Sequence, residues 1–165
     1  MRLDLREIIH VPGASLPFSF QLDLSQEEFF GEHPIPRPVT VEGSVKNIAD
    51  VLVLEGEAKS LLDYTCDRCM SGFSREKTVP LSFLLAETLE GEDDGEIVLL
   101  EDGEIDVGEL AYTAFILDMD TKHLCSEDCK GLCPGCGVNL NQEPCRCKKQ
   151  ADPRWAALEQ LLNKN

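Results

Sequence analysis

Basic residues are scarce in this 165-residue sequence. It contains 15 Lys and Arg against 31 Asp and Glu, which gives a net charge of −16 at pH 7. A protein that binds nucleic acid through its phosphates needs clustered Lys and Arg side chains. The charge balance therefore argues against a general nucleic-acid-binding surface.

Signals of a membrane or secreted protein are also missing. There is no leader with a basic start and an apolar run, and no apolar stretch approaches the roughly 20 residues that a helix needs to cross a bilayer. We therefore expect a cytoplasmic protein. In a reducing compartment, the eight cysteines indicate metal or redox chemistry rather than a disulfide framework.

Catalytic motifs are the third absence. The three histidines, His10, His33 and His123, are scattered, and no Gly-rich phosphate loop, Ser–His–Asp order or pair of catalytic acids is found. His123 lies two residues before Cys125 and could replace a cysteine as a metal ligand, although an ordinary core or surface role fits it better. We predict that the protein is not an enzyme.

What the sequence does contain is a cluster of cysteines. Six of the eight lie within the 23 residues from Cys125 to Cys147. The segment Cys133-Pro-Gly-Cys136-Gly is typical of a zinc knuckle, because thiolates on a tight turn can both reach one Zn²⁺ and backbone N–H groups can stabilise the sulfur charge. All eight cysteines form close pairs: Cys66/Cys69, Cys125/Cys129, Cys133/Cys136 and Cys145/Cys147.

Two zinc sites are the simplest account of these pairs. One would use Cys133, Cys136, Cys145 and Cys147, and the other Cys66, Cys69, Cys125 and Cys129. A single zinc beside four free thiols is an alternative, and so is an exchange of ligands in which Cys129 replaces Cys145. Iron–sulfur ligation is a lesser alternative, because spacing alone does not separate it from zinc.

Catalytic use of the cysteines is disfavoured. A thiol–disulfide enzyme places its CxxC at a helix N-terminus, whereas Cys66 ends a predicted strand and Cys133 has four cysteines close by in the cluster. A hydrolytic zinc site leaves one coordination position open, but these cysteines can saturate both metals.

Alternating hydrophobic residues predict a sheet. Two strands are expected in residues 1–24, and residues 39–85 form an antiparallel meander with a turn at Asn47 to Asp50. The even positions of its second strand, Leu52, Leu54, Ala58, Leu62 and Tyr64, should be buried. Cys66-Asp-Arg-Cys69 then falls at the tip between two strands.

The remaining elements follow from helix and loop signals. Residues 86–109 hold eleven acidic residues and no basic one, and we interpret them as a solvated, mobile loop. A helix should begin at Asp106, with Glu109 in capping-box register, and a last helix at Asp152-Pro153 with Trp155 in its apolar stripe.

The predicted fold class is α+β: an antiparallel sheet or partly closed barrel with one or two packed helices and a C-terminal Cys-rich zinc-knuckle module. We place the sheet domain at residues 1–122, with a helix near 106–118, the zinc module at 123–150 and the last helix at 151–165.

The sequence resembles the large ribosomal RNA subunit accumulation proteins, the YceD-like family, in a zinc-binding subgroup. The resemblance rests on Cys66-Asp-Arg-Cys69, the acidic segment, the Gly-Glu-Ile-Asp helix start, the cluster containing Gly-Leu-Cys-Pro-Gly-Cys-Gly-Val-Asn-Leu-Asn, and Asp152-Pro153-Arg154-Trp155. It covers most of the chain from about residue 40. Some family members lack most of these cysteines, so zinc is an elaboration of the fold.

The resemblance implies a bacterial protein needed for normal levels of large-subunit ribosomal RNA, and it implies no catalytic residues. Because the chain is acidic, we expect its partner to be a basic ribosomal protein or a precursor particle carrying one, rather than naked RNA. The alternative function is a thiol-redox or zinc-responsive factor that uses the CxxC pairs.

Overall fold

The computed structural model describes residues 1–88 and 97–147. The chain divides into two compact units. The sheet unit consists of Met1–Thr65 and Gly72–His123. The cysteine unit consists of Cys66–Ser71 and Leu124–Asn165, of which residues 124–147 are described. The short segment at the tip of a hairpin therefore belongs to the same unit as the C-terminal cysteine cluster.

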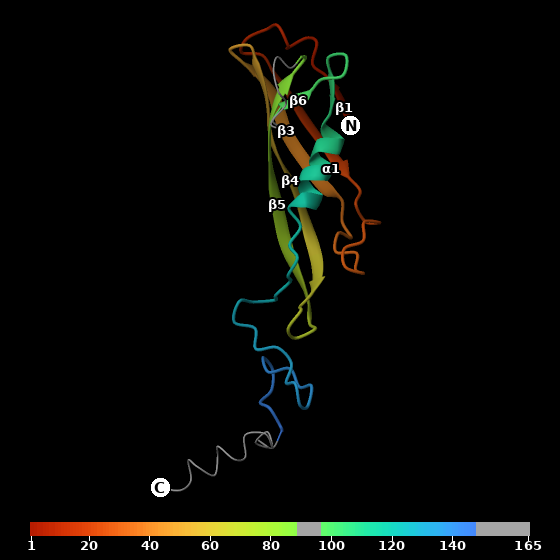
Figure 1. Cartoon of the computed structure of the whole chain (residues 1–165), viewed down its shortest axis with the longest axis vertical. Helices are drawn as coiled ribbons and strands as arrows, with labels where there is room; N and C mark the ends of the chain where they lie inside the picture. Colours follow the sequence, from red (N-terminus) through yellow and green to blue (C-terminus); the bar gives the residue numbers. More distant parts are fainter. Residues whose placement is uncertain (89–96, 148–165) are drawn as a thin grey trace, which may run out of the picture. The chain divides into compact units, whose positions relative to one another are not determined.

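The sheet unit is built on a five-stranded sheet in the order β2-β3-β4-β5-β6 (Figure 1). The strands are β2 (Ser15–Leu22), β3 (Val39–Ile48), β4 (Val51–Thr65), β5 (Gly72–Ala86) and β6 (Ile97–Leu99). Neighbours are antiparallel from β2 to β5, and β6 pairs parallel to β5. The predicted antiparallel meander over residues 39–85 is confirmed, but the parallel pair was not predicted.

Alternation along the strands places one face of the sheet in the core. The even positions of β4 that the sequence predicted to be buried, Leu52, Leu54, Ala58, Leu62 and Tyr64, are all buried. The turn between β3 and β4 also lies where it was predicted, with Ala49 and Asp50 at φ 52° and 67°. Two consecutive positive φ values are typical of the tight hairpin turn that matches the twist of the strands.

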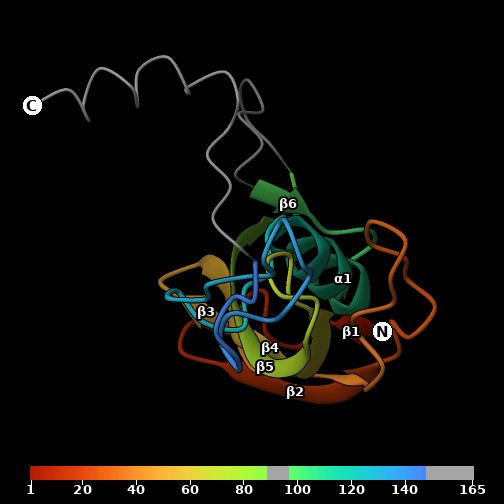
Figure 2. The same cartoon turned by 90° about the horizontal axis from the view of Figure 1, so that it is seen from below.

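One helix, α1 (Val107–Leu117), packs against β5 and β1. Viewed end-on, the sheet curves around the side on which α1 lies (Figure 2). Asp106 caps the helix, since its side chain accepts a hydrogen bond from the Glu109 amide at 3.2 Å, so the predicted helix start is confirmed. Phe115 and Ala111 enter the core from the buried face of the helix.

The prediction of a loop over residues 86–109 is wrong in part. Ile97–Leu99 form β6, and β7 (Glu104–Asp106) pairs antiparallel with β1 (Arg2–Asp4) in a separate two-stranded ribbon. The high average acidity concealed one short apolar run, Ile97 to Leu100, and a single buried apolar residue, Ile105, between two acidic ones. Residues 89–96 lie outside the described residues, as does the predicted helix at 151–165 with Trp155. In the described part, no helix is long and apolar enough to cross a membrane.

Candidate metal centre

Four cysteines meet around the tip of the β4–β5 hairpin. We call Cys66, Cys69, Cys125 and Cys129 the hairpin group, and their Sγ atoms all lie within 4.8 Å of one another. The Cys66 and Cys129 sulfurs are 3.8 Å apart, and those of Cys69 and Cys125 are 3.7 Å apart. A tetrahedral Zn²⁺ with bonds of about 2.3 Å requires sulfurs about 3.8 Å apart. The spacing of these thiols thus suits one tetrahedral metal ion.

The hairpin tip presents two of these sulfurs on a tight turn. Cys66 directly follows β4, and its amide donates to the Ser71 carbonyl at 3.0 Å. The Met70 amide donates back to the Cys66 carbonyl at 2.9 Å, with Met70 at φ 56°. The prediction that Cys66-x-x-Cys69 lies between two strands is confirmed.

Arg68 links this turn by hydrogen bonds to the segment that carries Cys125 and Cys129. Its Nη1 donates to the carbonyls of Glu127 at 3.2 Å and Cys129 at 3.0 Å. Its own carbonyl accepts from the Leu132 amide at 2.8 Å. Sequence reasoning missed this role, for which the only signal was a basic residue inside a CxxC of an acidic chain.

The other four cysteines also converge. We call Cys133, Cys136, Cys145 and Cys147 the C-terminal group, whose sulfurs again lie within 4.8 Å of one another. Cys133 Sγ is 3.3 Å from Cys145 Sγ and 3.8 Å from Cys147 Sγ. A tight turn holds the first pair, because the Gly137 amide donates to the Cys133 carbonyl at 2.8 Å with Gly137 at φ 72°.

The packing around the C-terminal group shows whether its thiols suit a metal ion. A Cβ added to Gly135 would lie 2.7 Å from Cys147 Sγ, so only glycine lets the turn approach this sulfur. Four thiolates in a tetrahedral arrangement are the donor set of zinc or of iron–sulfur centres. Both groups could therefore hold a soft metal ion, and neither needs a further ligand.

Two asparagines connect the two groups. Asn141 lies in the loop between Cys136 and Cys145, yet its Nδ2 donates to Cys129 Sγ of the hairpin group at 3.2 Å. Its Oδ1 accepts from the Lys130 amide at 2.8 Å.

Asn139 orients Asn141, because Asn139 Oδ1 accepts from the Asn141 amide at 3.0 Å. Asn139 Nδ2 in turn donates to Ser71 Oγ at 3.2 Å. The Asn-Leu-Asn segment was noted in the sequence, but its role was not predicted.

Backbone amides favour ionisation of thiols in both groups. Burial opposes ionisation of Cys66, but the amides of Cys125, Cys69 and Arg68 outweigh it and lower the pKa to about 6. Hydrogen bonds from the amides of Val138 and Arg146 lower the pKa of Cys136 to about 6 as well. Amide donors of this kind stabilise sulfur charge at metal knuckles.

Other thiols in the two groups have a raised pKa. The pKa of Cys125 rises to about 12, first because nearby protein atoms partly desolvate its sulfur, although the residue is exposed, and then because of its hydrogen bonds to neighbouring thiols. Hydrogen bonds to Cys136, Cys145 and Cys133 raise the pKa of Cys147 to about 12. A bound cation would replace the shared protons and remove this conflict.

The structure groups the cysteines as the favoured sequence interpretation did. Cys129 lies in the hairpin group and Cys145 in the C-terminal group, so the alternative in which Cys129 replaces Cys145 as a ligand is not supported. None of the eight cysteines forms a disulfide bond. His123, weighed as a substitute ligand, belongs to neither group; its ring stacks on Tyr64 with 4.0 Å between ring centroids.

Comparison with known proteins identifies relatives of the chain. The family model described as large ribosomal RNA subunit accumulation protein YceD matches residues 54–162. An uncharacterized protein of Mycobacterium tuberculosis is 33% identical over 125 residues, which are 72% of this chain and 59% of the relative. The large ribosomal RNA subunit accumulation protein YCED homolog 1, chloroplastic, of Arabidopsis thaliana is 26% identical over 163 residues, covering 79% of this chain and 50% of the relative.

A third relative, an uncharacterized protein of Mycobacterium leprae, is 27% identical over 132 residues, which are 76% of this chain. The match spans 59% of the length of the mycobacterial relatives. No solved structure matches the chain. The family model covers well over half of the chain and includes every cysteine described above, so the chain belongs to the YceD family.

Proposed function

We propose that this protein is a non-catalytic zinc protein that supports accumulation of large-subunit ribosomal RNA by binding a basic ribosomal protein or a precursor particle. The process comes from the family's description. The observation that carries the zinc assignment is the pair of complete four-cysteine groups. Each can satisfy a tetrahedral ion without leaving a position for water or substrate, which is the arrangement of structural rather than catalytic zinc.

Zinc would be held by the hairpin group and by the C-terminal group, and when bound it supplies folding free energy. The chain's own residues prepare both places. Arg68 closes the hairpin tip against the Cys129 segment, and Asn141 donates to the Cys129 sulfur. Because four thiolates would fill every coordination position of each ion, the metal would have a structural role and not a catalytic one.

Charge supports a protein partner over naked RNA. A chain with a net charge of −16 repels phosphate, whereas ribosomal proteins that bind RNA are basic. Complementary charge accelerates encounter and selects partners. Binding to a precursor particle should therefore weaken as salt rises and survive digestion of free RNA by nuclease.

Elemental analysis of protein purified without added metal tests the zinc assignment. We expect two zinc ions per chain and no reactive thiol after loading. If one zinc and four titratable thiols are found, only one of the two proposed sites holds metal. If iron and labile sulfide are found, the sites are iron–sulfur centres and the zinc assignment is wrong. Thiols that stay reactive in the zinc-loaded protein would favour the thiol-redox or zinc-responsive alternative.

A genetic test addresses the process. In a bacterium deprived of its own YceD-family protein, expression of this chain should restore the ratio of large- to small-subunit ribosomal RNA. Cys66→Ser should fail to restore it, whereas a Ser replacement of the exposed Met70, next to the hairpin group but not a ligand, should succeed. Full restoration by a metal-free variant would show that the zinc sites are dispensable for the process.

A further inference from the structure

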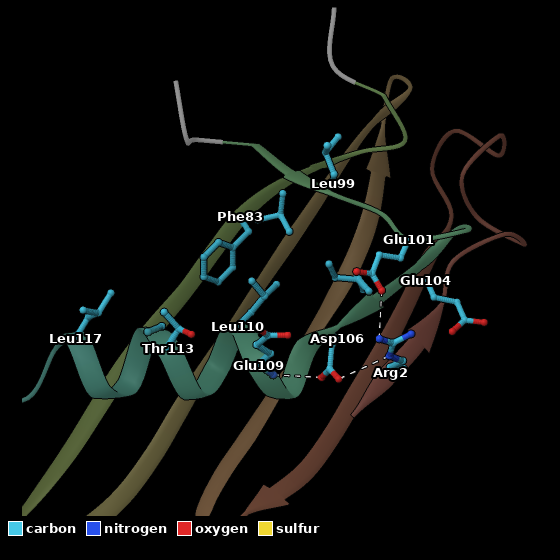
Figure 3. A pocket seen from close by; sticks show the side chains of 13 residues that line it. Arg2, Phe83, Leu99, Glu101, Glu104, Asp106, Glu109, Leu110, Thr113 and Leu117 are labelled. Atoms are coloured by element: carbon cyan, nitrogen blue, oxygen red, sulfur yellow. Dashed lines mark hydrogen bonds and ion pairs between the residues drawn. The ribbon is translucent and has the colours of Figure 1, made fainter. Parts of the chain in front are cut away.

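A groove of about 380 Å³ opens in the sheet unit, between α1 and the β5–β6–β7 side (Figure 3). Its floor is apolar and includes Phe83 of β5, Val98 of β6, and Leu110 and Ala114 of α1. The groove contains no cysteine, and all of its lining residues belong to the sheet unit. It is therefore a feature separate from both cysteine groups.

Large apolar side chains at the groove are left in solvent. Leu117, at the end of α1, is 80% exposed, and Leu99, in the edge strand β6, is 46% exposed. Figure 3 shows them on the two walls of the groove. Exposed apolar residues that line one concavity, unlike scattered single ones, are typical of a protein-interaction site.

One end of the groove carries acidic side chains (Figure 3). Among the described residues, Glu101, Glu104, Asp106 and Glu109 line this end. Arg2, Arg6 and the Met1 amino group pair with the first three of these carboxylates, which leaves one negative charge in excess at the groove. Arg2 pairs with Glu101 at 3.2 Å and with Asp106 at 3.9 Å, as the dashed lines of Figure 3 indicate.

Two further ion pairs lie at this end of the groove, and the first joins the Met1 amino group to Asp106 Oδ1 at 2.9 Å. Arg6 pairs with Glu104 at 2.8 Å, whereas Glu109 is exposed in the first turn of α1. An apolar trough with an acidic end complements a segment that carries Leu-like residues on one side and Lys or Arg on the other.

We propose that this groove is the docking site for a basic amphipathic segment of the partner protein. The inference rests on the proposed function for the nature of the partner, a basic protein, and it adds the surface that binds it. Exposed leucines would bury their side chains against the apolar face of the segment, and the carboxylates would set its direction. Nucleic acid is disfavoured, because the same carboxylates would face its phosphates.

The test uses the full, zinc-loaded chain and a fluorescein-labelled helical peptide with one Leu face and Lys elsewhere, followed by fluorescence anisotropy. Leu117→Ser should weaken peptide binding about tenfold, because a leucine buried in the complex is lost. The Glu101→Gln/Glu109→Gln double variant should weaken it about fivefold and reduce its salt dependence. A peptide with Glu in place of Lys should not bind.

Matched controls make the site specific. Phe30→Ser removes a large side chain that is also 80% exposed but lies outside the groove. The Glu7→Gln/Glu28→Gln double variant removes two exposed carboxylates elsewhere. Both controls should bind the peptide like the wild type, and all variants should show the wild-type melting temperature and zinc content.

Equal weakening by groove and control variants, or no binding of the Lys peptide, would overturn the proposal. A labelled large-subunit RNA fragment that binds the wild type but not Leu117→Ser would overturn it in favour of nucleic acid. Because the peptide assay does not depend on ribosomal RNA levels, its failure is distinguishable from failure of the proposed function, which is read out by zinc content and the RNA ratio.

Discussion

The hairpin group is buried except for Cys125, whereas the C-terminal group is exposed except for Cys133. The two groups also differ in how far apart their cysteines lie in the sequence. Cys69 and Cys125, in contact in the hairpin group, are 56 residues apart in the chain, but the whole C-terminal group lies between Cys133 and Cys147. A metal in the first would close a long loop, while a metal in the second would order a short one. Identical donor sets can thus have different structural roles.

The two groups are not independent despite this contrast. Asn141 belongs to the loop of the exposed group and donates to a sulfur of the buried group. Leu132, one residue before the first ligand of the C-terminal group, donates its amide to Arg68 at the hairpin tip. A metal ion that orders one group should therefore also hold the cysteines of the other group in place for their own metal ion.

The largest expected effect comes from removing a ligand of the C-terminal group. Cys133→Ser should abolish hydrogen-exchange protection over residues 130–147, because structural zinc supplies on the order of 10 kcal/mol of local folding free energy. Strands β3, β4 and β5 should keep their protection, since they bury a core of their own. Exchange measured by mass spectrometry would decide, and a loss of protection throughout residues 39–85 would contradict the separation of roles.

Asn141→Ala should have the next largest effect, and it should act on the group to which Asn141 does not belong. Loss of its hydrogen bond to Cys129 should weaken metal binding by the hairpin group about tenfold to a hundredfold, as expected for a residue that supports a ligand. Cobalt(II) titration resolved into two binding steps measures this. Gln142→Ala, an exposed neighbour, is the control, and equal effects of the two variants would show that the link is unimportant.

Gly135→Ala should weaken metal binding by the C-terminal group more than by the hairpin group. The new Cβ would lie 2.7 Å from Cys147 Sγ, and relieving such overpacking costs about 1–3 kcal/mol, equivalent to roughly fivefold to a hundredfold in metal affinity. Gly72→Ala is the matched control, because a Cβ there meets nothing within 4 Å. The same titration applies, and an unchanged metal affinity of the C-terminal group in Gly135→Ala would mean that the turn relaxes without cost.

The smallest effect is kinetic. A zinc chelator should remove metal in two phases, because exposed thiolates are more accessible to attack than buried ones. The fast phase should disappear in Cys136→Ser and the slow phase in Cys66→Ser, followed by the absorbance of a chromophoric chelator. A single phase in the wild type would show that the difference in burial does not control release.

Much of the sheet could be predicted because its signals are local. The alternation from Leu52 to Tyr64, the turn at Ala49 and Asp50, and the Asp106 cap each depend on residues within a few positions of one another. The loop predicted over residues 86–109 failed for a related reason. Strands as short as Ile97–Leu99 have too few residues to stand out against acidic surroundings, and their pairing with β5 or β1 supplies the stability.

By itself, the sequence determined the cysteine pairs, the hairpin that carries Cys66 and Cys69, and the excess of acid, since these are properties of composition and short spacing. Only the tertiary structure decided that the Arg68 carbonyl, which accepts from the Leu132 amide, and the Asn141 side chain join the two groups, and that α1, β6 and β7 leave an apolar groove with an acidic end. Those features bring together residues such as Arg2 and Glu101, which are 99 positions apart. No local pattern encodes such contacts, because they arise only when the core positions whole elements against one another.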